Sequence, residues 1–96
     1  MSRGMLRKAA ERLVDQLSSA ASYNDKGYLW TGHSAAQSEA LRDGWRREFQ
    51  ELRAVLEPAG LPPSLAEALR SGAAAEDWSG DYVIAAREWL TRWPEA

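Results

Sequence analysis

The chain contains no cysteine and a single histidine, so several kinds of chemistry lack their usual residues. Without cysteine there can be no disulfide, thiolate metal ligand or cysteine nucleophile. A zinc site needs about four ligands, and His33 has no second histidine or cysteine to help it. We therefore predict no metal site and no cofactor. The absence of cysteine also favours a reducing, cytoplasmic location.

Long apolar runs are missing as well. No segment approaches the ~20 consecutive apolar residues of a membrane-spanning helix, and the first residues, MSRGMLRKAAERL, lack the apolar stretch of a secretory signal. We expect no membrane partner. A length of 96 residues favours one domain, covering residues 1–96.

Lysine is scarce, and the charges are unevenly distributed. Residues 1–57 carry nine basic and eight acidic side chains, whereas residues 58–96 carry three and six. Phosphate binding needs clustered lysine and arginine, so the acidic part is a poor partner for nucleic acid. Seventeen alanines, and ten arginines against two lysines, are typical of a GC-rich genome and suggest a bacterial or phage source.

Apolar residues recur at helical spacing in three long segments. The pattern predicts helices over 4–22, 34–57 and 80–93, and Ser64 with Glu67 predicts a capped short helix over 65–71. The predicted core comprises Leu13, Leu17, Leu41, Trp45, Phe49, Leu52, Leu56, Leu69, Val83 and Leu90.

No segment alternates like a strand, so we predict an all-α fold without a sheet. The expected architecture is a compact bundle of about four helices, three longer and one short. Asn24, Asp25 and Gly27 are turn formers and predict a break over 22–33. Pro58 and its neighbours predict the end of the second long helix.

Two similar stretches, LWTGHS at 29–34 and DWSGDY at 77–82, fit the beginnings of helices. With Ser79 as the N-cap, Trp78 and Val83 have the spacing of a hydrophobic staple, which predicts that Trp78 points inward. The second long helix has two possible starts, at Thr31 or at Ser34.

The motif Trp30–Thr31–Gly32, in a helical chain of this length, resembles the small substrates of type VII secretion. That family forms a two-helix hairpin, whereas Pro58 and Pro62 interrupt this chain. The family's C-terminal Tyr-x-x-x-acid signal also fails here, because Ala86 stands four residues after Tyr82. We do not assign the chain to that family.

Five tryptophans are many for a core this small, so the alternative to two simple helix entries is that one tryptophan is an exposed anchor for a partner. The best candidate is the cluster of Tyr28, Leu29 and Trp30 between two glycines. A second candidate is the acidic rim formed around Trp78, which would suit a basic partner. Its three acids are Glu76, Asp77 and Asp81.

These residues predict a non-enzymatic helical module that binds another protein, as an inhibitor or adaptor. One alternative is a DNA-associated regulator of helix-turn-helix type, but its basic face would be interleaved with acids. The arginines of that face are Arg42, Arg46, Arg47 and Arg53. The other alternative is an enzyme, and nothing places an acid beside His33 to complete a triad with Ser34 or Ser38. A homo-oligomer is compatible with the sequence.

Overall fold

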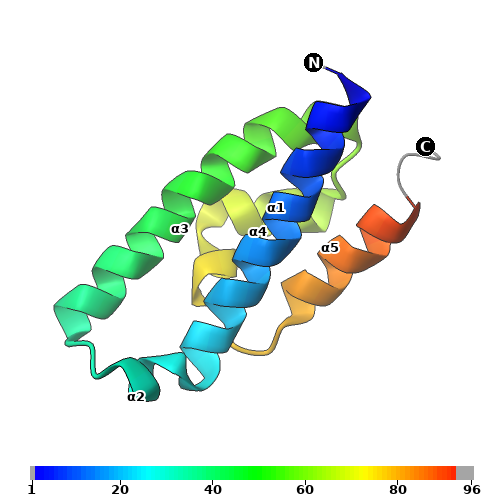
Figure 1. Ribbon diagram of the computed structural model, residues 1–96. Coiled ribbons are helices and arrows are strands. Elements are labelled where there is room, and N and C mark those ends of the chain that lie inside the picture. The colour runs from blue at the N-terminus through cyan, green and yellow to red at the C-terminus, as the bar shows by residue number, and fades with distance from the viewer. Residues whose placement is uncertain (1, 93–96) are drawn as a thin grey trace.

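A computed structural model describes residues 2–92, and every regular element in that range is helical (Figure 1). The main helices are α1 (Arg3–Ser22), α3 (Ala35–Leu56), α4 (Pro63–Ser71) and α5 (Asp81–Arg92). The predicted all-α bundle of three longer helices and one short helix is therefore confirmed. No helix in the described range is both long and apolar enough to cross a membrane.

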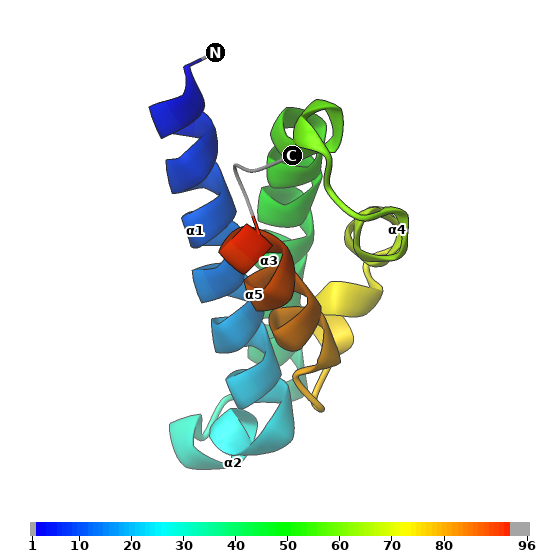
Figure 2. The ribbon, with the colours of Figure 1, turned by 90° about the vertical axis from the view of Figure 1, so that its right-hand side faces the viewer.

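Helix α1 packs between α3 and α5, and α4 crosses behind them (Figure 1). In Figure 2, α4 is seen nearly end-on while α1 and α3 run along the molecule. The core receives side chains from all four helices. Eight predicted core residues are buried: Leu13, Leu17, Trp45, Phe49, Leu52, Leu56, Leu69 and Val83.

Two predicted core residues behave differently. Leu90 is only partly buried, and Leu41 is 38% exposed, so its placement in the core was wrong. At that end of α3 the inward position belongs to Ser38, which is buried and hydrogen-bonded to Tyr23. Leu41 consequently lies at the edge of the apolar stripe. The predicted last residue of the third long helix, Trp93, lies outside the described residues.

The helix ends follow simple capping chemistry. Ser34 and Gln37 form a reciprocal capping box, so α3 starts after Ser34 and not at Thr31. The predicted box at Ser64 is absent, because α4 begins two residues earlier than expected, at Pro63. A proline suits the first helical position, since its ring presets the backbone angle and the missing N–H would have no partner there.

The predicted break over 22–33 is correct only in part, because α1 ends at Ser22 and α3 begins at Ala35, but most of the segment between them is helical. After α1 the chain continues through a π-helical turn, η1 (Tyr23–Gly27), into the single-turn helix α2 (Tyr28–Thr31). Gly32 then ends α2 in the left-handed conformation, with φ of 69°. The turn-forming residues do not interrupt the helix, because Tyr23 is buried and the side chain of Asn24 is bonded to another part of the fold.

The start of α5 also differs from expectation. Ala73–Glu76 forms a short 3-10 helix, η3, and α5 begins only at Asp81. The carboxylate of Asp77 accepts the N–H groups of Ser79 and Gly80 at 3.2 and 3.1 Å. Helix α5 therefore starts one residue later than expected, although Oγ of Ser79 still accepts the N–H of Asp81 at 3.3 Å. The staple spacing is lost, and Trp78 is 68% exposed. The inward placement of Trp78 was wrong.

Candidate protein-binding surface

The single turn α2 presents three large apolar side chains to solvent. Tyr28 is 42% exposed, Leu29 67% and Trp30 83%. We call these three residues the apolar end, because α2 lies at the end of the molecule opposite the N-terminus (Figure 1). Burying such side chains away from water is favourable, so exposing them together leaves free energy available for binding.

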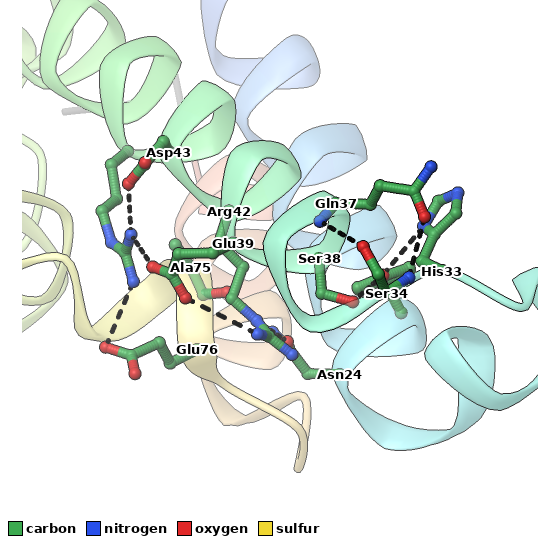
Figure 3. A network of polar contacts seen from close by, with 12 residues as sticks. Asn24, His33, Ser34, Gln37, Ser38, Glu39, Arg42, Asp43, Ala75 and Glu76 are labelled. Atoms are coloured by element: carbon green, nitrogen blue, oxygen red, sulfur yellow. Dashed lines mark hydrogen bonds and ion pairs between the residues drawn. The ribbon is translucent and has the colours of Figure 1, made fainter.

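A buried tyrosine anchors the segment that leads into the apolar end. The ring of Tyr23 packs against Trp45, with ring centroids 5.7 Å apart. Its hydroxyl lies 2.6 Å from Oγ of Ser38 and 3.0 Å from Nδ1 of His33, which links the residues on both sides of α2 to α3 (Figure 3). The chain is therefore fixed before and after the exposed turn.

Asn24 ties the same π-helical turn to η3. Its side-chain amide donates to the carbonyl oxygens of Ala75 and Asp77 at 2.7 and 2.9 Å. Its side-chain oxygen accepts from Nε of Arg42 at 2.8 Å (Figure 3). One side chain thus joins three segments that are far apart in sequence, and it holds the base of the apolar end in place.

Arg46 forms the centre of an ion-pair cluster beside this network. Its guanidinium lies 2.6 Å from Glu39, 2.5 Å from Asp43 and 3.7 Å from Glu76 (Figure 3). The hydrogen bond with Glu39 raises the pKa of Arg46 above its ordinary value, although burial acts in the opposite direction. Glu76 is consequently paired within the fold.

The predicted acidic rim is thus largely committed to internal contacts. Glu76 pairs with Arg46, and the Asp77 carboxylate accepts from the chain just before α5. Asp81 is exposed in the first turn of α5 and makes no ion pair within residues 2–92. The rim and the outward-facing Trp78 share one edge, and Asp81 is the acid whose carboxylate has no partner within residues 2–92.

A second surface that the sequence did not reveal lies between α1 and α5, and it combines polar side chains with exposed apolar ones. This α1–α5 groove is open to solvent and has a volume of about 320 Å³. Its lining residues are Ser18, Ala21, Ser22, Asp25, Trp78, Ser79, Gly80, Val83, Ile84 and Arg87. Ile84 is 54% exposed. The periodicity of α5 predicted that Val83 lies in the core. It did not predict that Ile84 and Arg87 line a groove beside α1.

The three residues considered for catalysis, His33, Ser34 and Ser38, make hydrogen bonds within the fold. Oγ of Ser34 accepts the N–H of Gln37, and Ser38 bonds to Tyr23. Nδ1 of His33 contacts the tyrosine hydroxyl and no carboxylate. Within the described part of the chain, no group of three or more histidine, aspartate or glutamate side chains is placed to hold a metal ion.

The fold and this surface define a small helical bundle with an ordered, exposed aromatic end. Comparison with known proteins finds no matching family model, no similar curated protein and no similar solved structure.

Proposed function

We propose that this chain is a non-enzymatic module of the cytoplasm that binds another protein through its apolar end, as an inhibitor or an adaptor. The observation that carries the proposal is the exposure of Leu29 and Trp30 on one helical turn. Tryptophan is enriched among the residues that dominate binding energy, because it buries a large area and loses little conformational entropy.

The anchoring of α2 strengthens the proposal. Tyr23 fixes the segment before the turn, and the Ser34 capping box fixes the start of α3 after it. A side chain that is already held in place loses less entropy when a partner binds. A protruding, ordered turn suits insertion into a cleft on the partner, which is how a small protein can block a functional site.

The contacts of α3 disfavour the DNA-binding alternative. Arg46 and Arg53 lie in ion pairs with acids of the same helix or its end, and Arg42 lies near Glu39 and bonds to Asn24. Releasing counterions from DNA requires basic side chains that can neutralise phosphates. Three of the four arginines of the predicted basic face are therefore already paired with carboxylates, and only Arg47 makes no ion pair within residues 2–92.

Affinity capture with three forms of the chain tests the proposal. The wild type, a Leu29→Ser/Trp30→Ser double variant and a Met5→Ser control are used as bait in extract from the source cell. Met5 is 59% exposed, but it lies near the other end of α1. We expect a partner that the wild type and the control retain, and that the double variant loses by at least about tenfold.

The same experiment can contradict the proposal. If every protein retained by the wild type is retained equally by the double variant, the apolar end is not the binding surface. Circular dichroism of all three forms must show the same helix content, because the comparison concerns binding alone.

A further inference from the structure

The α1–α5 groove carries charges of opposite sign. Among its lining residues only Asp25 and Arg87 are charged, and neither forms an ion pair within residues 2–92. Asp25 lies where α1 runs out into the π-helical turn. Arg87 lies six residues into α5, which is about 9 Å along the helix axis. Because α5 runs back along α1 (Figure 1), the two charges stand at opposite ends of the groove.

The apolar side chains are arranged between these charges. Trp78 precedes α5 and so belongs to the end that holds Asp25, whereas Ile84 lies further along toward Arg87. The floor consists of small residues such as Ala21 and Gly80. One end of the groove therefore offers a carboxylate and an aromatic ring, the other end offers a guanidinium, and the exposed side chain of Ile84 lies between them.

We propose that the occupant of this groove is a second copy of the same chain, laid antiparallel across it. A two-fold axis near Ile84 would place Arg87 of each copy against Asp25 and Trp78 of the other. The guanidinium would then gain a salt bridge and a cation–π contact, twice in each dimer. Such self-complementarity is what a two-fold symmetric interface requires, because the same patch serves both partners.

The size of the patch indicates a weak dimer. A standard interface buries ~800 Å² on each partner, which is roughly a seventh of the 5749 Å² of accessible surface here. The groove is smaller than that, so association in the micromolar to millimolar range is expected. A net charge of −2 on each copy opposes association only weakly. The dimer would carry its two apolar ends facing in opposite directions.

Charge reversal tests the dimer, and a mixture of variants tests its geometry. The dissociation constant is measured by sedimentation equilibrium for the wild type, Asp25→Arg and Arg87→Asp. Each reversal places like charges together at both symmetric contacts, so we expect at least a tenfold weaker dimer. Mixing the two variants should restore dimerisation, because each contact then again pairs an arginine with an aspartate.

Two further variants serve as controls. Glu51→Arg makes the same change of charge as Asp25→Arg on the exposed face of α3, and it should leave the dissociation constant unchanged. Leu29→Ser/Trp30→Ser should also leave it unchanged, since the groove is independent of the proposed function of the apolar end. A wild type that stays monomeric up to millimolar concentration overturns the proposal. So does a mixture that fails to restore the dimer, or a dimer that depends on the apolar end and not on Asp25 and Arg87.

Discussion

At the residue scale, side chains that look alike in the sequence have opposite fates. Trp45 and Trp78 both stand beside polar residues in the sequence, yet Trp45 is buried and Trp78 is exposed. Trp45 lies on a helical stripe, and the spacing of such a stripe does predict burial. Trp78 was predicted to point inward because it has the spacing of a hydrophobic staple with Val83. That prediction fails if the helix begins one or two residues later. Asp77 causes that shift by accepting the backbone N–H groups ahead of α5.

Replacing Trp78 and Phe49 by alanine should therefore have very different effects on stability. Phe49 has no exposed surface, and Phe49→Ala should lower the free energy of unfolding by ~3–5 kcal/mol. Trp78→Ala should change it by less than about 0.5 kcal/mol, as at other surface positions. Urea denaturation followed by circular dichroism measures both. A loss above about 2 kcal/mol for Trp78→Ala would mean that its ring packs inward after all.

Asn24 shows what single-sequence reasoning cannot reach. Its type indicates a turn, because asparagine often bonds to its own backbone. In the structure its amide instead reaches residues 75 and 77, more than fifty positions away. No local pattern encodes that pairing, since it depends on where η3 packs against α1. The surface formed around Asn24 was therefore beyond prediction, although Tyr28, Leu29 and Trp30 could be named from their composition.

At the element scale, apolar periodicity predicted the long helices correctly. Predictions from turn-forming residues were less accurate for the segments that connect them. The stripes of α1, α3 and α5 each repeat over three or more turns, so errors at single positions such as Leu41 do not hide them. A π-helical turn has no repeat to detect. It adds one residue within a helix and arises here because Tyr23 and Asn24 both have partners inside the fold.

Two glycine substitutions test how α2 and α3 are built. A Cβ added at Gly32 or at Gly44 meets no atom within 4 Å, so neither change causes a clash. Gly32 has a positive φ, and Gly32→Ala should cost ~1–2 kcal/mol through backbone strain alone. Gly44 lies within α3, and Gly44→Ala should add up to about 1 kcal/mol of stability. Thermal unfolding of the two variants shows whether each substitution raises or lowers the stability of the protein. If Gly32→Ala stabilises the protein, α2 does not end in the left-handed turn.

At the scale of the whole molecule, the end formed by α2 contributes less to the stability of the fold than the helices around the core do. The core fills the space between α1, α3, α4 and α5, and α2 lies beyond it with three large apolar side chains exposed. Stability alone does not explain this placement, because polar residues would be more favourable in that turn. The proposed explanation is that α2 is kept ordered for a partner. The dimer proposed for the α1–α5 groove would present two such ends, facing in opposite directions.

Backbone ¹⁵N relaxation by NMR, on the free protein, tests this explanation most directly. The account predicts that the amides of Tyr28–Thr31 have order parameters near those of α1 and α3, about 0.85, because Tyr23, Asn24 and the Ser34 cap hold the turn. Order parameters below about 0.6 across these four residues would contradict it. The apolar end would then be a flexible connection between α1 and α3 and not a surface prepared for binding.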